Sequence, residues 1–391
     1  MMIDLPPLQR LTPLQRPVIV QPGPRQASFG DIVARLDPAT THVLVTVNGN
    51  AVTARATDGG TIRLKVSLPR RNSTIRVIAR NASGGRAMAE VSPVYGFPRA
   101  GRPTFFQGSE DPRLARRIRR VALGFRGISA VYVQNLRTGR GAAWNARARF
   151  PAASTLKLGI ALEVLRVLRS QPGPDTRLGT LLRRMIVSSD NAAANALLVW
   201  LGGSQTGGAA RVNASLGALG LRESQMFGGY ILGTSATRPI PLRVERQPAF
   251  GIGKYTTAWD LALFHRLLHL ASVERGRMMS LSGSFTAGDA RHLLFLLTHV
   301  QDPGKLDRFI GDLGVSVPHK SGWITYARHD SGIVYWASGS FVVTVMTWNG
   351  GAVGTSSDVL AGRVAEVALE RFSEAGSTIS PLVFRLQSVS A

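Results

Sequence analysis

The sequence predicts an α+β domain preceded by a small all-β sandwich. Residues 31–97 alternate apolar and polar positions over short segments, with turn signals such as Asn48-Gly49 between them, which is typical of a sandwich. Within residues 113–375, strand-like segments come first, a helical stretch follows from about residue 154 to 270, and strand-like segments return at SGIVYWA and FVVTVMTW. Strands, then helices, then strands predict one sheet that both ends of the domain assemble.

Three further segments flank or connect these units. Residues 1–30 are rich in Pro, Gln and Arg without periodicity, so we expect a flexible tail. Residues 98–112 are expected to be a linker, and residues 376–391 a C-terminal tail. Within the first unit, the segments VNG, LP and NSTIRVIARNASGG together resemble the bacterial immunoglobulin-like modules of surface and secreted proteins.

The amino-acid composition limits the classes of protein to which this chain can belong. The 391 residues are 44% hydrophobic, and no stretch approaches 18 unbroken apolar residues, so the chain is expected to be globular without a transmembrane segment. The net charge of +24 comes almost entirely from arginines, which are scattered singly and in pairs. Without a zinc-finger spacing or an RNA-binding strand motif, we expect no nucleic-acid partner, and the charge favours some attraction to anionic cell-wall polymer.

The chain contains no cysteine, which excludes disulfides, thiolate metal sites and thiol catalysis. His265 and His269 lie four residues apart, but Arg266 stands where a zinc protease helix would carry its glutamate. We therefore expect helix-surface or core histidines, and no metal or organic cofactor is implied. The N-terminal segment shows no signal peptide, so the sequence leaves open a missing leader, another export route or an internal location.

A serine and a lysine at helical spacing form the first chemical motif. Ser154 precedes the apolar segment LKLGIALEVLRVL, so it should lie at a helix N-terminus, where unpaired N–H groups and the helix dipole stabilise an oxyanion. Lys157 follows one turn later on the same face, within reach of the Ser154 hydroxyl. A desolvated lysine near other cations can accept a proton. The pair predicts a nucleophile and its general base, and the alternative is a capping serine beside a solvated lysine.

The second motif is Ser189-Asp190-Asn191, between two helical segments. Ser189 is suited to relay a proton to a leaving nitrogen and Asn191 to hold a substrate amide, while Asp190 is expected to cap the following helix. An ordinary capping turn would explain Ser189 and Asp190 but leaves Asn191 without a reason.

The third motif is Lys320-Ser321-Gly322, in sequence that fits an edge strand. Lysine and serine suit recognition of a carboxylate, and glycine permits close approach of a substrate backbone. The N–H of Trp323 is placed to complete an oxyanion hole.

The order and the context of these motifs resemble the β-lactamase and penicillin-binding serine hydrolases over about residues 118–372. The segments PAASTLKL, MIVSSDNAAANALL, YTTAWDLA and HKSGWITYARHDSGIVY carry the resemblance. It implies an acyl-enzyme at Ser154, formed from a β-lactam or a peptidoglycan-derived substrate, with Ser189 and Lys320 handling the leaving-group proton. It also implies a monomer that works outside the cytoplasm, secreted or in the cell envelope.

One family feature is missing. Class A β-lactamases carry an E-x-x-L-N segment whose glutamate activates the water that hydrolyses the acyl-enzyme. Between residues 195 and 254 the only carboxylates are Glu223 and Glu245. Glu245 is the better-placed candidate for the deacylating base, although Arg243 and Arg246 make a surface ion pair the alternative.

Acylation is therefore expected, whereas fast deacylation is in doubt. A β-lactamase competes with a cell-wall D,D-peptidase or an esterase as the function. From another class, a catalytically silent envelope-binding protein is the alternative, and the joint presence of Lys157 and Lys320 argues against it.

Overall fold

The computed structural model describes residues 13–104, 107–230, 246–248, 253–281, 285–351 and 353–374. The chain divides into two compact units, Met1–Arg99 and Ala100–Ala391. Glu245, the candidate deacylating base, lies outside the described residues.

The N-terminal unit is a β-sandwich, as predicted. One sheet has the order β1-β3-β6 and the other the order β2-β8-β7-β4-β5. Alternate side chains of both sheets pack into one core, which includes Ile32, Val45 and Val77. The strands are β1 (Val18–Gln21), β2 (Gln26–Ser28), β3 (Asp31–Leu36), β4 (His42–Val47), β5 (Asn50–Ala56), β6 (Gly60–Lys65), β7 (Asn72–Arg80) and β8 (Arg86–Gly96).

The unit begins earlier than the predicted boundary. Strands β1 and β2 lie within residues 1–30, the expected tail, where β1 pairs with β3 and β2 pairs in parallel with β8. Strands of four and three residues are too short to show an alternation in sequence. The resemblance to immunoglobulin-like modules stays a prediction.

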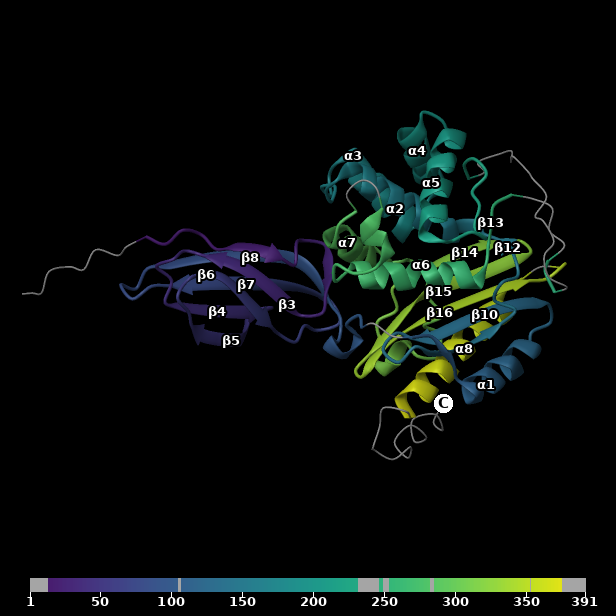
Figure 1. Cartoon of the computed structure of the whole chain (residues 1–391), viewed down its shortest axis with the longest axis horizontal. Helices are drawn as coiled ribbons and strands as arrows, with labels where there is room; N and C mark the ends of the chain where they lie inside the picture. Colours follow the sequence, from purple (N-terminus) through teal and green to yellow (C-terminus); the bar gives the residue numbers. More distant parts are fainter. Residues whose placement is uncertain are drawn as a thin grey trace, which may run out of the picture. The chain divides into compact units, whose positions relative to one another are not determined.

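The second unit is built on a six-stranded sheet with the order β14-β15-β16-β10-β11-β9 (Figure 1). Strand β10 pairs with β16, so both ends of the domain do assemble one sheet. The pairing is antiparallel except between β9 and β11. The strands are β9 (Ser109–Glu110), β10 (Ile128–Asn135), β11 (Arg140–Trp144), β14 (His319–Ile324), β15 (Ala327–Trp336) and β16 (Gly339–Trp348), and a separate pair is formed by β12 (Phe150–Pro151) and β13 (Tyr255–Thr256).

Helices cover both faces of this sheet. On one face, α1 (Pro112–Leu123) and α8 (Thr355–Glu374) share an apolar core with β10, β15 and β16 (Figure 1). On the other face lies α6 (Ala258–Ala271), whose His269 Nδ1 is 2.8 Å from the Tyr335 hydroxyl. His265 and His269 are both buried, so they are core residues of this helix.

The remaining helices surround α2 (Lys157–Leu168), which follows the short helix η2 (Ala153–Leu156). Its neighbours are α3 (Arg177–Val187), α4 (Asn191–Gly202), α5 (Gln205–Leu219) and α7 (Ala287–Leu297). Every residue from 157 to 165 is buried, because helices contact α2 on several sides. Short helices η1 (Arg99–Gly101), η3 (Arg277–Ser280) and η4 (Gly311–Leu313) complete the unit.

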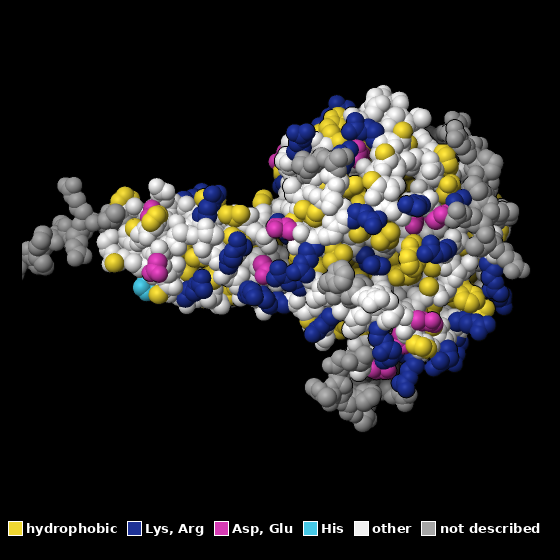
Figure 2. All heavy atoms as spheres, in the orientation of Figure 1, with side chains coloured by type: hydrophobic (Ala, Val, Ile, Leu, Met, Phe, Trp, Pro, Cys, Tyr) yellow, Lys and Arg dark blue, Asp and Glu magenta, His cyan; other side chains and the backbone are white. Residues whose placement is uncertain are grey.

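Two further observations concern membrane-spanning helices and surface charge in the described part of the chain. No helix there has the length and apolar character needed to cross a bilayer. On the face shown in Figure 2, Lys and Arg side chains are spread in small groups and do not form one continuous stripe.

Candidate active site

Ser154 lies in η2, between the end of β12 and the start of α2. The segment is held by Ala152, whose N–H donates to the Lys254 carbonyl at 2.8 Å and whose carbonyl accepts from the Thr155 hydroxyl at 2.6 Å. Ala153 has a φ of 46°, a left-handed conformation that is uncommon for a residue with a side chain. Such backbone strain gathers at functional sites. Here it lies directly before the half-buried Ser154.

Lys157 is the first residue of α2 and is fully buried. Its Nζ donates to the Ser154 Oγ at 2.9 Å, to the Asn191 Oδ1 at 2.7 Å and to the Ser189 backbone carbonyl. These three acceptors suit a protonated amine. Once Lys157 is neutral, the Ser154 hydroxyl can donate to Nζ instead, which is the arrangement that proton transfer from the serine requires.

The electrostatics favour the neutral amine. The pKa of Lys157 is lowered to about 7, mainly by burial and also by the charges of Lys320 and Lys254, while the charge of Asp190 opposes them. Burial also lowers the pKa of Lys320 and of Lys254, each to about 8. A large fraction of Lys157 is therefore unprotonated at neutral pH, as a general base needs.

These pKa values predict a bell-shaped pH dependence of Ser154 acylation. The rate should rise as pH passes about 7, because Lys157 then loses its proton. It should fall as pH passes about 8, because Lys320, the expected proton source for the leaving group, then loses its proton. The second-order rate constant for adduct formation, measured by intact mass from acid to alkaline pH, checks this. A rate that falls as pH rises through neutrality would contradict it.

The Ser189-Asp190-Asn191 turn joins α3 to α4. Asp190 accepts from the Ala193 N–H at 2.9 Å and caps α4, as predicted. Ser189 has a φ of 56°, and its Oγ lies 3.0 Å from Lys320 Nζ and 3.3 Å from Lys157 Nζ. The Ser189 hydroxyl thus bridges two lysines, so a proton can pass along Ser154, Lys157, Ser189 and Lys320.

Strand β14 is the edge of the sheet and lies against the serine. A Cβ on Gly322 would be 2.7 Å from the Ser154 nitrogen and 2.9 Å from the Thr155 nitrogen, so a side chain there would collide with backbone. Lys320 and Ser321 are buried, whereas Trp323 is 63% exposed. The structure thus brings seven predicted residues together: Ser154, Lys157, Ser189, Asn191, Lys320, Ser321 and Gly322.

The carboxylate expected to activate water is not among the described residues of this cluster. Glu223 forms an ion pair with Arg149, and the Arg149 Nε lies 2.8 Å from the Glu223 Oε2. In the described ranges, no carboxylate is hydrogen-bonded to Ser154 or Lys157.

Sequence reasoning missed Tyr230 and Lys254. The Tyr230 ring lies between two amines, with its centroid 4.6 Å from Lys157 Nζ and 4.5 Å from Lys254 Nζ. Asn195 fixes the Tyr230 backbone, donating to its carbonyl at 2.7 Å and accepting from its N–H at 2.5 Å. Tyr230 therefore occupies the space beside the Lys157 amine.

A signal for Lys254, though not for Tyr230, was present in the composition. Of the 47 cationic residues only five are lysines: Lys65, Lys157, Lys254, Lys305 and Lys320. Four of the five belong to this cluster. Lysine shifts its pKa readily when buried and arginine does not, so lysine in an arginine-rich chain marks places where proton exchange is useful.

Comparisons with known proteins identify the family of the second unit. The Beta-lactamase2 model, described as "Beta-lactamase enzyme family", matches residues 113–171 and 166–372. The chain therefore belongs to the β-lactamase enzyme family. No curated protein matches the sequence.

Solved structures share the fold. A beta-lactamase from Sphaerobacter thermophilus DSM 20745 aligns with a TM-score of 0.51 and 22% identity over 68% of this chain and 98% of that one. PBP-A aligns with a TM-score of 0.54 and 20% identity over 69% and 100%. A beta-lactamase from Streptosporangium roseum aligns with a TM-score of 0.52 and 19% identity over 68% and 100%.

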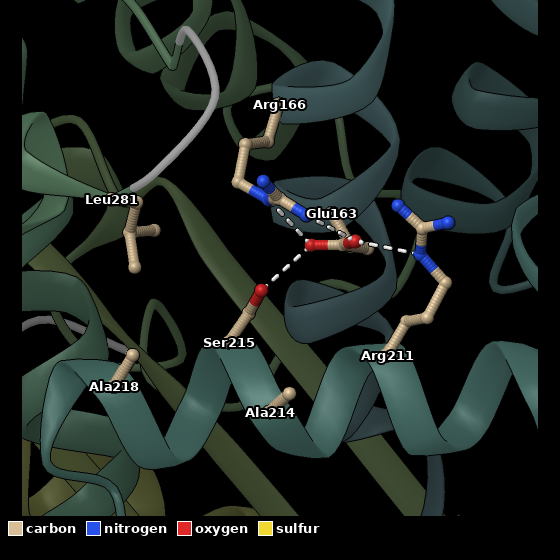
Figure 3. Close-up of a pocket in the computed structure, with 7 residues that line it drawn as sticks. All are labelled: Glu163, Arg166, Arg211, Ala214, Ser215, Ala218 and Leu281. Carbon is tan, nitrogen blue, oxygen red and sulfur yellow. Dashed lines mark hydrogen bonds and ion pairs between the residues drawn. The ribbon is translucent and has the colours of Figure 1, made fainter.

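A cavity of about 170 Å³ lies between α2 and α5, outside the Ser154 cluster (Figure 3). The carboxylate of Glu163, fully buried, faces it and accepts from Arg166 Nε at 2.8 Å, Arg211 Nε at 3.2 Å and Ser215 Oγ at 2.6 Å. Burial alone would raise the pKa of Glu163, but the bonds from Arg166 and Ser215 hold it below its usual value. The Glu163 carboxylate, on α2, bonds to Arg211 and Ser215 of α5, so it fastens the helix that carries Lys157 to α5.

Replacing Glu163 with glutamine should therefore cost about 3 kcal/mol of stability, because the fully buried anion is removed and Arg166, whose side chain is only 17% exposed, loses its partner. Denaturation followed by the helical circular dichroism signal measures this in the second unit, since the first is all-β. Glu366→Gln is the matched control: its i,i+3 partner Arg363 is 52% exposed, so a loss of no more than about 1 kcal/mol is expected. Equal losses for both variants would contradict the assigned role.

Proposed function

We propose that this protein is a serine hydrolase that forms an acyl-enzyme at Ser154 with β-lactams or related cell-wall amide and peptide substrates. The observation that carries the proposal is the 2.9 Å contact between the Ser154 hydroxyl and the buried amine of Lys157. Family membership supports the same class of chemistry. Peptidoglycan lies outside the cytoplasm, so this substrate class places the protein's work there.

Acylation begins when neutral Lys157 takes the Ser154 proton as Oγ attacks the substrate carbonyl carbon. The developing oxyanion is stabilised by the N–H groups of Ser154 and Trp323, which the close approach of Gly322 to the Ser154 nitrogen supports. The Asn191 Oδ1 accepts from Lys157, which leaves its amide NH₂ to hold a substrate carbonyl.

Collapse of the tetrahedral intermediate breaks the carbon–nitrogen bond. The leaving nitrogen receives a proton through the Ser189 hydroxyl, which is replenished from the lysine on either side, Lys157 or Lys320. In a β-lactam this nitrogen stays attached through the opened ring, so the whole molecule remains bound to Ser154.

Hydrolysis of the acyl-enzyme is proposed to be slow. The group beside Lys157 is the ring of Tyr230. Burial raises the pKa of its phenol well above the usual value, so the phenol stays protonated and cannot act as the base that takes a proton from water. Glu245 stays the proposed candidate for a deacylating base. This favours the behaviour of a penicillin-binding peptidase or a slow β-lactamase.

A fluorescent penicillin, followed by digestion and mass mapping, tests the proposal. The label should map to the peptide that contains Ser154. A label on another residue, or no label after prolonged incubation, would contradict it.

A further inference from the structure

The hydroxyl of Ser321, one residue beyond Lys320, already has a carboxylate partner. Ser321 Oγ donates to the Asp302 carboxylate, and Ser321 is only 2% exposed. Asp302 lies in the connection between α7 and β14. The serine that was expected to recognise a substrate carboxylate is thus covered by one from its own chain.

The buried Lys305 is the second partner of Asp302. Lys305 forms an ion pair with Asp302, and the Lys305 side chain is 2% exposed while that of Asp302 is 30% exposed. Burial opposes ionisation of Asp302, but the bonds from Lys305 and Ser321 hold its pKa below the usual value. The exposed member of the pair is therefore the Asp302 carboxylate, on which the charge of Lys320 also acts. Had Lys305 been the exposed partner, the same place would attract a carboxylate.

We propose that Asp302 is a specificity-determining residue, which disfavours acyl donors with a free carboxylate at this position and favours donors that are neutral or cationic there. This inference rests on acylation at Ser154. A substrate carboxylate would have to displace Asp302 from Ser321 and Lys305 or lie beside it, and like charges in a partly dehydrated site repel strongly. A neutral group avoids this repulsion, and an ammonium group can pair with the Asp302 carboxylate, whose side chain is partly exposed.

The test compares benzylpenicillin with its methyl ester, which keeps the reactive ring and lacks the negative charge. Adduct formation is followed by intact mass, and the adduct is mapped to Ser154. On the wild-type protein the ester should react faster than the acid. A faster acid overturns this inference and leaves the proposed function standing, whereas no Ser154 adduct from either compound overturns the proposed function and this inference with it.

Asp302→Asn sharpens the comparison, because asparagine keeps an acceptor for Ser321 and removes the charge. The ester-to-acid rate ratio should fall by about tenfold or more, through a faster reaction of the acid. Asp312→Asn removes the same charge from an exposed position in η4 and should leave the ratio unchanged. An unchanged ratio in Asp302→Asn overturns the proposal, and the wild-type comparison decides it if that variant does not fold.

Discussion

Replacing Ser154 with alanine should abolish the covalent adduct with any β-lactam. In the proposed mechanism the hydroxyl oxygen forms the acyl bond, and Ser189 is not expected to replace it, because Ser189 lies one step further along the chain of hydrogen bonds. Intact mass after long incubation with excess drug measures the effect.

The Ser154→Ala variant should remain folded, since the segment is held by backbone bonds of Ala152 and by Thr155. Ser170→Ala, at an exposed position just after α2, is the control and should react like wild type. A full mass increase in Ser154→Ala would show that the nucleophile is another residue.

Replacing Lys157 with methionine should lower the rate constant of acylation by about 10²–10⁴, the usual contribution of a general base. Methionine has a similar length and no charge, so it fits a fully buried position without leaving a large cavity. The initial rate of adduct formation at neutral pH measures the loss.

Lys65→Met provides the control, because Lys65 is the exposed lysine of the N-terminal unit. A Lys157→Met protein that reacts at the wild-type rate would show that the Ser154 proton leaves by another route. In the expected case, Lys157→Met also loses the rise in acylation rate through neutral pH, because that rise reflects the loss of the Lys157 proton.

Local pattern predicted much of the fold. The return of strand character after the helical stretch predicted one sheet from both ends of the domain, and β10 does pair with β16. The cap at Asp190 and the edge position of β14 were also predicted, because capping and edge strands depend on neighbouring residues. The helix α8 was not predicted, and neither was the full burial of residues 157–165 in α2, since a helix enclosed by others is buried beyond one face.

Parts of the site could not be predicted in this way. Tyr230 and Asp302 belong to no motif, and they reach the cluster through tertiary contacts with Lys157 and Ser321. Spacing along the chain carries no information about such contacts. The scarcity of lysine is a signal that could have singled out Lys254 and Lys305, although it carries no information on which groups they meet.

The most direct test of the central claim is intact-protein mass over time with benzylpenicillin, continued after the excess drug has been removed. The account predicts a mass increase equal to the whole drug, because ring opening releases no fragment, and an adduct that persists once free drug is gone. Rapid consumption of many equivalents with only a transient adduct would contradict slow deacylation and make Glu245 the first residue to replace, and no adduct at all would contradict acylation at Ser154.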